Sequence, residues 1–419
     1  MLRQAQHDTS FQNAIQLKNI IIIGGGAAGF FAAINCAQKN PDYQVTILEK
    51  SSSVLNKVKV SGGGRCNVTH ACFDAKELVK YYPRGEKQLL GAFTKFNPSH
   101  TLDWFEQRGV EIKKEADGRM FPISDSSQTI IDCFLSEAKM LGVVVKMQCG
   151  VDGLRVVGSG FRVNTSTNEE FKADAVIINT GSSHNVWKML ETLGHKIIAP
   201  VPSLFTFNIN DERIKGLQGL AVQEAVVKIC NSKSVFSIPS SALLITHTGM
   251  SGPAILRLSA WGARELAAVN HQFEIQVNWV NKDFNSVKET LKLFRQNHPK
   301  KGVATNPLFG IPKRLWERIT TRISQPVTLN FADLSNQQIE SLAYELTAAR
   351  FKVSGKSTFK DEFVTAGGVD LAEIDFRTMQ SKIVPNLYFA GEVLDIDAIT
   401  GGFNFQAAWT TAFIASQTI

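Results

Sequence analysis

The sequence predicts an α/β fold in which one domain is built from two separate pieces of the chain, with a second unit inserted between them. Continuous apolar or β-branched runs are typical of parallel strands covered on both faces. Such runs occur before residue 200, at 19–23 and 175–179, and again close to the C-terminus, at 386–390. Between about 200 and 250 the pattern changes to alternating segments that favour antiparallel sheet. The outer regions therefore belong to one parallel sheet, and the middle of the chain belongs to a different unit.

Length and composition agree with a globular chain of more than one domain. At 419 residues the chain is too long for one compact core, and 44% hydrophobic with 20% charged residues is typical of a well-packed protein. It has six cysteines and no Cys-x-x-Cys pair, so we expect reduced thiols. The uncharged run at 20–34 is short for a membrane span and contains glycines, which favours a buried strand and turn. We expect a cytoplasmic protein that does not associate with membranes.

The insertion is expected to combine strands of an antiparallel sheet or barrel with helices. Segments at 221–229, 234–238 and 242–246 predict strands, and segments at 285–297 and 312–323 predict helices. The expected boundaries are 17–196 for the first piece of the outer domain, 197–350 for the insertion and 351–419 for the second piece.

The first fifty residues predict a βαβ unit. A strand at 19–23 leads into a helix at 27–39, and a second strand follows at 44–48. Two parallel strands joined through a helix form a right-handed unit of this kind. The turn between the first strand and the helix is therefore at the carboxyl edge of the sheet, where ligands bind in such folds.

A Gly-x-Gly-x-x-Gly motif, formed by Gly24, Gly26 and Gly29, occupies that turn. The first glycine permits the tight turn, the second lets the backbone approach a pyrophosphate, and the third lets helix and strand pack closely. Glu49 lies twenty residues after Gly29, where its carboxylate can accept hydrogen bonds from ribose hydroxyls. This Rossmann-like unit predicts dinucleotide binding without deciding between FAD and NAD.

Two further glycine clusters favour FAD. The segment at 61–67 places three glycines before an arginine, in a loop whose N–H groups can face an anionic or carbonyl-bearing ligand. Near the C-terminus, Gly391 and Glu392 close a strand, and Gly401 and Gly402 open a helix with free N–H groups. A flavin dinucleotide is long enough to need several such contacts, whereas NAD needs fewer.

Four longer motifs resemble one flavoprotein family. SGGGRCN at 61–67, THTGMSGPAIL at 246–256, TAGGV at 365–369 and YFAGEVLDIDAITGGFNFQ at 388–406 are similar to the BaiN/aminoacetone-oxidase-type NAD(P)/FAD-dependent oxidoreductases of the two-dinucleotide-binding-domain superfamily. The resemblance implies a Rossmann-like FAD-binding domain in two sequence pieces, with an inserted β-barrel and a small helical subdomain. The residues then expected to bind FAD are Gly24, Gly26, Ala27, Ala28, Gly29, Glu49, Lys50, Lys57, Ser61, Gly62, Gly63, Gly64, Arg65, Asn67, Val151, Thr180, Gly181, Gly391, Glu392, Gly401, Gly402, Phe403 and Asn404.

The chain departs from the family pattern near the expected cofactor. Asn56 stands where glycine is expected before the lysine, and Asn179-Thr-Gly-Ser182 replaces Ala-Thr-Gly-Gly. Ala412 and Ser416 replace glycines in the last helix. Ser182 changes a turn on the flavin side, so these departures leave the substrate range open.

The catalytic residues are not identified by the sequence, because a flavin performs hydride chemistry itself. Arg65 is a candidate for stabilising an anionic flavin or a substrate carboxylate, and a structural pairing with an acid is an equal alternative. His247 is a candidate proton donor, against the plainer interpretation of a hydrogen-bonded histidine at a barrel turn. His70 and His184 have no acidic or cysteine neighbours at metal spacing, so we expect no metal.

Three other side chains in these motifs have structural interpretations. Asp395 and Asp397 follow Glu392 and are expected to anchor the loop that carries 400–404. Cys66 is interpreted as a packed thiol, since Cys72 is not at the five-residue offset of the disulfide reductases.

Charge bears on the partners. The segment 286–319 has eight Lys or Arg against two Glu, a net +6 in a chain of formal charge +7. A basic stripe of this kind can meet nucleic acid, but it is more often the solvated face of amphipathic helices. We therefore expect a small-molecule substrate and no nucleic-acid partner.

The function expected from these features is that of an FAD-dependent oxidoreductase acting on a small molecule. No second glycine motif marks a separate NAD(P) domain, so the flavin is reduced by NADH or NADPH as a transient reductant, or by the substrate itself. The alternatives are a flavin-dependent RNA-modifying protein, an amine oxidase-type flavoenzyme that uses oxygen, and a flavin-binding sensor without turnover. The sequence leaves the substrate, the electron acceptor and the oligomeric state open.

Overall fold

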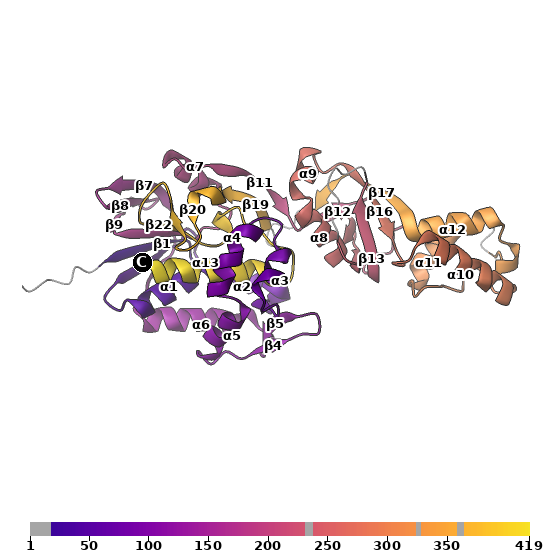
Figure 1. Cartoon of the computed structure of the whole chain (residues 1–419), viewed down its shortest axis with the longest axis horizontal. Coiled ribbons are helices and arrows are strands. Elements are labelled where there is room, and N and C mark those ends of the chain that lie inside the picture. Colours follow the sequence, from indigo (N-terminus) through magenta and orange to yellow (C-terminus); the bar gives the residue numbers. More distant parts are fainter. Residues whose placement is uncertain (1–17, 231–237, 324–327, 358–363) are drawn as a thin grey trace, which may run out of the picture.

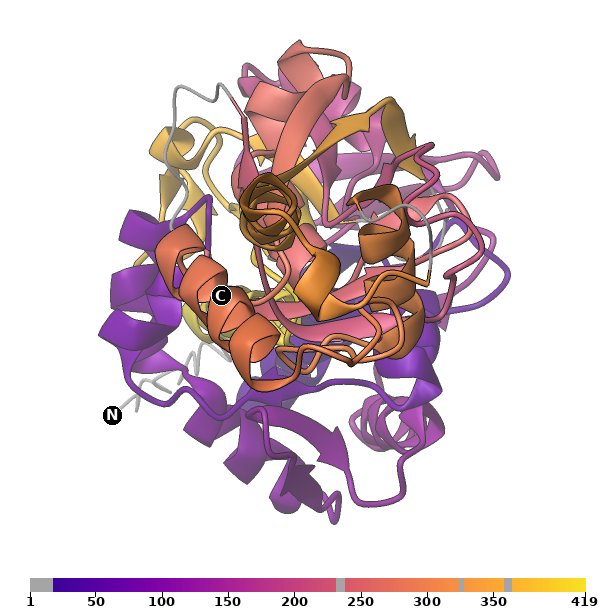
Figure 2. The same ribbon diagram turned by 90° about the vertical axis from the view of Figure 1, so that its right-hand side faces the viewer.

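A computed structural model describes residues 18–230, 238–323, 328–357 and 364–419. Figure 1 shows an elongated molecule with the two-piece domain at one end, an antiparallel sheet in the middle and a group of helices at the other end. Figure 2 views the molecule from the helical end, with the two-piece domain behind. No helix among the described residues is long and apolar enough to cross a membrane.

The two-piece domain is built on a seven-stranded sheet in the order β20-β21-β22-β10-β1-β2-β6. The strands from β22 to β6 are parallel, and β20 and β21 add an antiparallel edge. Strand β22 comes from the second piece of the chain, so the sheet itself joins the two pieces, as expected. The strands are β1 (Asn19–Ile23), β2 (Gln44–Leu48), β6 (Val144–Lys146), β10 (Ala175–Ile178), β20 (Ile374–Asp375), β21 (Gln380–Ser381) and β22 (Leu387–Phe389).

Helices from both pieces pack together on this sheet. Helix α1 is buried from Ala28 to Ala37, which explains the uncharged run at 20–34 without a membrane. Its Phe31 lies against Trp104 and Trp409, with ring centroids 4.6 and 5.2 Å away. The helices of this domain are α1 (Ala27–Lys39), α2 (Asn56–Gly64), α3 (Ala75–Leu78), η1 (Val79–Tyr81), α4 (Glu86–Lys95), α5 (Pro98–Glu106), α6 (Ser127–Met140), α7 (His184–Thr192), η3 (Leu371–Glu373), η4 (Gly391–Val393) and α13 (Phe403–Thr418), the η elements being 3-10 helices.

Two small antiparallel sheets complete the domain. One has the order β3-β5-β4 and the other the order β7-β8-β9. In the second sheet, β8 and β9 pair antiparallel as a hairpin. The strands are β3 (Thr69–His70), β4 (Ile112–Lys114), β5 (Arg119–Pro122), β7 (Val151–Val157), β8 (Gly160–Thr165) and β9 (Glu170–Ala173).

The insertion contains a second seven-stranded sheet in the order β17-β16-β13-β14-β15-β12-β18. Its edge strands β17 and β18 are separated in sequence only by Ser354, so the sheet curls back on itself as in the expected barrel. These edge strands extend past residue 350. The strand expected at 234–238 lies almost wholly outside the described residues. The strands are β12 (Thr206–Asn208), β13 (Ala221–Ile229), β14 (Ser241–Ile245), β15 (Gly249–Ser251), β16 (Phe273–Asn278), β17 (Ala349–Val353) and β18 (Gly355–Ser357).

Helices of the insertion have two locations. Helices α8 and α9 lie beside the barrel sheet, and α10, α11 and α12 lie at the end of the molecule in Figure 1. The end group shares a core with the barrel, including the fully buried Trp316 and Phe331. The helices are α8 (Pro253–Trp261), α9 (Ala263–Ala268), α10 (Phe284–Asn297), α11 (Lys313–Ile323), η2 (Phe331–Asp333) and α12 (Asn336–Ala348).

Two strands connect the two-piece domain to the insertion. β11 (Ile197–Ser203) pairs antiparallel with β19 (Val364–Val369), so the outgoing and returning chain run side by side. Helix α13 of the two-piece domain ends at the chain terminus on the far side, so its first turn is directed toward the insertion (Figure 1).

Candidate cofactor and active site

The glycine motif forms a tight turn at the start of α1. Gly24 has a φ of +112°, and a Cβ placed there would lie 2.6 Å from the carbonyl oxygen of Asn179. A Cβ at Gly29 would lie 1.9 Å from the carbonyl oxygen of Gly24. Gly26 is the N-cap of α1, without a side-chain cap and with no atom within 4 Å of its Cβ position. The first N–H groups of the helix are therefore open to an anionic group.

Glu49 is held in place at the end of β2 by two backbone amides. Its carboxylate accepts hydrogen bonds from Gly25 N at 2.7 Å and from Ser51 N at 2.8 Å. Its carbonyl oxygen accepts a bond from Cys149 N at 2.8 Å, which brings the chain before Val151 alongside. The structure therefore places Glu49 and Val151 on the same side of the glycine turn, where the adenosine half of a dinucleotide is expected.

A second group of expected residues lies between the two helix N-termini. Lys57 Nζ pairs with Glu392 Oε2 at 2.5 Å, and Thr365 N donates to Glu392 Oε1 at 3.0 Å. A Cβ at Gly181 would lie 3.5 Å from Glu392 Oε2, and one at Gly391 would lie 3.1 Å from the Ala28 Cβ. Residues from the turn after β10, from α2 and from η4 therefore meet beside the start of α1.

The glycine loop at 61–67 meets the start of α13. A Cβ at Gly402 would lie 2.5 Å from the carbonyl oxygen of Thr69 and 3.0 Å from Asn67 Oδ1. Gly402 is the N-cap of α13, and this helix also begins without a side-chain cap or an acidic residue. Asn404 braces the preceding loop by two hydrogen bonds with the backbone of Ala398, at 3.0 and 3.1 Å. This second open helix N-terminus is suited to a negative or carbonyl-bearing group.

Unpaired polar atoms at the end of β10 test whether a dinucleotide fits here. Both polar atoms of the Asn179 side chain, and the Thr180 hydroxyl, are shielded from solvent and have no hydrogen-bond partner among the described residues. Buried polar groups are costly unless they are paired. The phosphates and hydroxyls of a dinucleotide supply such partners beside the open end of α1. The residues at this turn are therefore chemically suited to a dinucleotide such as FAD.

The two catalytic candidates from the sequence lie in different parts of the molecule. Arg65 pairs with Glu115 at 2.6 Å and Asp125 at 3.4 Å, and its guanidinium lies 3.9 Å from the Phe121 ring centroid. This is the pairing with an acid that the sequence left as an alternative. His247 lies exposed in the turn between β14 and β15.

The Cys66 side chain is buried in the core of the two-piece domain. Burial raises the pKa of the Cys66 thiol to about 12, which suits a packed thiol and not a nucleophile. Among the described residues, no group of three or more His, Cys, Asp or Glu side chains could hold a metal ion.

Both aspartates that follow Glu392 anchor their loop. Arg264 Nη2 donates to both carboxylate oxygens of Asp395 at 2.7 Å. The carboxylate of Asp397 pairs with Arg84 and accepts a hydrogen bond from Ser203 Oγ at 2.7 Å. The hypothesis that these carboxylates anchor the loop is confirmed, and both partners come from segments remote in sequence.

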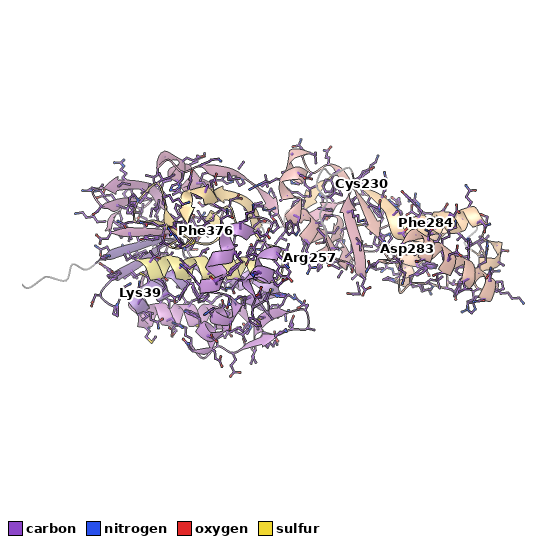
Figure 3. All side chains as sticks on the ribbon, viewed as in Figure 1. Lys39, Cys230, Arg257, Asp283, Phe284 and Phe376 are labelled. Atoms are coloured by element: carbon purple, nitrogen blue, oxygen red, sulfur yellow. The ribbon has the colours of Figure 1, made fainter. Side chains whose placement is uncertain are left out.

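Two further side chains lie near the junction, the boundary between the two-piece domain and the insertion. The sequence did not single them out as site residues. His70 Nδ1 and Arg257 Nε are both shielded from solvent and have no partner among the described residues. Figure 3 shows Arg257 at the boundary between the two-piece domain and the insertion. The only local signal was that Arg257 directly follows the family-like run at 246–256.

The bipartite Rossmann-like domain and the two open helix N-termini define a flavoprotein oxidoreductase. Residues 18–418 match the family described as "HI0933-like protein Rossmann domain". The chain belongs to this family.

Several known proteins are similar to this chain over nearly its whole length. The ribosomal RNA dihydrouridine synthase of Escherichia coli is 28% identical over 410 residues, covering 95% of this chain and 96% of that protein. The 3-dehydro-bile acid delta(4,6)-reductase of Clostridium scindens is 26% identical over 412 residues, covering 96% and 98%. The structure of a 3-ketosteroid delta1-dehydrogenase from Sterolibacterium denitrificans has a TM-score of 0.50 at 10% identity, covers 96% of this chain and 99% of that chain, and shows a shared fold.

These findings confirm the predicted class. The chain is an FAD-dependent oxidoreductase with the predicted α/β architecture. The expectation that nucleic acid is not a partner is not supported, because relatives from Escherichia coli and Haemophilus influenzae are named as ribosomal RNA enzymes.

Proposed function

We propose that this chain reduces the C5–C6 double bond of a uridine in ribosomal RNA, with electrons passed from NADH or NADPH through FAD. The names of both kinds of relative denote saturation of a carbon–carbon double bond. Dihydrouridine is uridine with that bond saturated, and a delta(4,6)-reductase saturates bonds in a steroid skeleton. The two kinds of relative therefore share a reaction type and differ in the class of substrate that they reduce.

The observation that carries the RNA substrate is the distribution of charge. Residues 197–350 contain seventeen Lys or Arg and eleven Asp or Glu, so the insertion accounts for +6 of the formal net charge of +7. The two-piece domain is almost neutral by the same count. Binding to a phosphate backbone depends on such a basic unit, whereas a steroid needs none.

Several cations in the insertion are oriented without being neutralised. Arg295, Arg314 and Arg318 donate to backbone carbonyl oxygens at 2.8, 2.5 and 3.2 Å, and none of them forms an ion pair in the described ranges. Lys301 lies 5.6 Å from the Phe294 ring centroid. A carbonyl contact fixes a guanidinium but leaves its full charge, so these side chains can meet phosphates.

The chain supplies binding and orientation for the reaction. The N-termini of α1 and α13 offer amides to negative groups of the cofactor, and Glu49 is fixed where it can accept from ribose hydroxyls. When bound, FAD accepts two electrons from NAD(P)H and delivers a hydride to the substrate. Because the C5–C6 bond of uridine is conjugated with the C4 carbonyl, the hydride arrives at C6 and C5 takes a proton from water. The sum is the addition of two electrons and two protons, which equals two hydrogen atoms.

The test is to incubate the FAD-loaded protein anaerobically with NADH or NADPH and bacterial ribosomal RNA transcribed in vitro, which carries no modifications. Mass spectrometry of nuclease fragments should show one uridine gaining two hydrogens, dependent on the reductant. Reactions without the protein and reactions with free uridine serve as controls.

A parallel reaction with an unsaturated steroid ketone separates the two substrate classes. If the steroid is reduced and no RNA fragment gains mass, the RNA substrate is wrong and a small-molecule reductase remains. If the flavin is never reoxidised by either substrate, the proposed double-bond reduction is wrong altogether.

A further inference from the structure

His70 has one ring nitrogen engaged and one free. Nε2 lies 3.2 Å from the carbonyl oxygen of Asp117, so Nε2 carries the proton of the neutral ring. Nδ1 is then an acceptor, and it has no partner among the described residues. Burial lowers the pKa of His70, and the charges of Arg257 and Lys114 lower it further against the opposing effect of Asp117, so the neutral ring prevails at pH 7.

The imidazole lies beside the glycine turn that opens α13. Its ring stacks on Phe403 with centroids 4.6 Å apart, and Tyr81 stacks on the same ring at 4.3 Å. A Cβ at Gly401 would lie 3.6 Å from His70 Cδ2. The free acceptor is therefore fixed next to a turn that the sequence assigns to the flavin.

Arg257 approaches the same place from the insertion. One terminal nitrogen of its guanidinium donates to Ser241 Oγ at 3.0 Å, while Nε has no partner in the described part of the chain. Its charge acts on His70, although the two residues belong to different units of the molecule. A shielded guanidinium nitrogen without a partner is costly unless a ligand or solvent compensates it.

The position of Arg257 is fixed relative to the glycine turn at Gly401 and Gly402, which opens α13. Arg84 donates to the carbonyl oxygen of Ala260 at 2.6 Å and also pairs with Asp397. Ala260 lies one helical turn after Arg257 in α8, and Asp397 lies on the loop that leads to Gly401. The Arg84 guanidinium thus holds helix α8, which carries Arg257, against the loop that leads from Asp397 to Gly401.

We propose that His70 and Arg257 together bind the uracil ring, with the Arg257 guanidinium on the C4 carbonyl oxygen and His70 Nδ1 accepting the hydrogen bond of N3–H. A free acceptor and a cationic donor at the same boundary between the two units are the two kinds of group that the adjacent N–H and C=O groups of a cyclic imide require. This inference rests on the proposed function, because N3–H is present in uracil and absent from a steroid ketone.

The same arrangement assists the reduction. When the hydride reaches C6, the electron pair of the C5–C6 bond moves toward C4 and its oxygen gains negative charge. The Arg257 guanidinium stabilises this oxygen, and the partial burial of Arg257 strengthens the interaction. C5 then takes a proton from water and the C4 carbonyl is restored, so the ring has gained one hydride and one proton.

A binding experiment without turnover tests His70. The oxidised FAD-loaded protein is titrated with a short single-stranded RNA that contains one uridine, and with the same RNA carrying N3-methyluridine, by fluorescence anisotropy. The wild-type protein should bind the uridine RNA about tenfold more tightly, since methylation removes the donor and leaves the acceptor unpaired. His70→Phe keeps the ring stack and should abolish this preference, while His70→Asn should retain part of it.

A kinetic experiment tests Arg257. Arg257→Met should slow reoxidation of reduced flavin by ribosomal RNA about 100-fold, as for the loss of an oxyanion donor, and leave reduction by NADPH unchanged. Arg257→Lys keeps a positive charge, so its reoxidation rate should lie between those of the wild-type protein and Arg257→Met. Arg155→Met on β7, where the side chain is exposed, is the matched control and should change neither rate. Melting temperature and FAD content show that each variant is folded, and Arg257→Lys decides if Arg257→Met does not fold.

Failure of this inference is distinct from failure of the proposed function. If wild-type protein reduces ribosomal RNA while His70→Phe keeps the preference for uridine and Arg257→Met keeps the reoxidation rate, the binding pair is wrong and the function stands. If wild-type protein reduces no RNA, the proposed function fails before any variant is made.

Discussion

The guanidinium of Arg84 pairs with the carboxylate of Asp397 where the two-piece domain meets the insertion. Asp397 is fully buried, and its carboxylate also accepts a hydrogen bond from Ser203 Oγ at 2.7 Å. Arg84 donates in addition to the carbonyl oxygen of Ala260 at 2.6 Å. The ion pair therefore joins the end of β11, helix α8 and the loop before α13, and it sets the geometry of the junction.

We predict that Asp397→Asn lowers the free energy of unfolding by about 3 kcal/mol, because it leaves the Arg84 charge buried without its partner. The loop before α13 should loosen as well, and FAD should dissociate faster. Urea unfolding of the FAD-loaded protein and the rate of flavin release measure the two effects. Lys80→Met is the control, since it removes the partner of Glu77 in an exposed ion pair and should change stability little. Equal effects of the two substitutions would contradict the structural role of the buried pair.

A methyl group at Gly29 should prevent normal cofactor binding. The added Cβ would lie 1.9 Å from the carbonyl oxygen of Gly24, so α1 would have to move away from β1. We expect Gly29→Ala to weaken FAD binding at least about tenfold, measured by quenching of flavin fluorescence on titration of the apoprotein.

The matched control for this substitution is Gly91→Ala. Gly91 lies inside α4 with no atom within 4 Å of its Cβ position, so alanine should raise the stability by roughly 0.5–1 kcal/mol through helix propensity. FAD affinity should not change. Normal FAD binding by Gly29→Ala would show that the turn tolerates the shift of α1.

The sequence predicts those parts of the candidate site that are formed by residues close together in the chain. Gly24, Gly29 and Glu49 act through the turn and strand ends that they themselves form, so their spacing predicts their place. The pairs that assemble the junction have no such signal, because Arg84 and Asp397 are 313 residues apart in the chain. The charge of Arg257 likewise acts on His70 only because two units of the molecule pack together. Local pattern therefore predicts the glycine turn with its acidic residue, whereas tertiary packing determines the junction between the two units.

The stability of the protein should depend on pH through His70. Burial lowers the pKa of His70 below its ordinary value of 6.5, so the unfolded chain binds this proton more readily than the folded chain. Above about pH 6.5 the free energy of unfolding is not reduced by this group. It decreases as the pH falls below that value, because the unfolded chain then takes up the proton. His70→Asn removes the group, so its free energy of unfolding should fall less steeply between pH 7 and 5. Parallel curves for the two proteins would contradict burial of the neutral ring.

Binding to RNA should depend on salt mainly through the insertion. Lys300 and Lys301 are exposed at the end of α10, in the unit that carries most of the net charge. We predict that the double substitution Lys300→Gln and Lys301→Gln weakens binding to ribosomal RNA and lowers the slope of log K against log salt by about 1.5, the value for two lost phosphate contacts. The matched control replaces Lys139 and Lys172, which are exposed on the two-piece domain, and should leave the slope unchanged. Filter binding at several salt concentrations gives both slopes. If the control changes the slope as much as the substitution in the insertion, RNA binds by overall charge and the insertion has no special part in it.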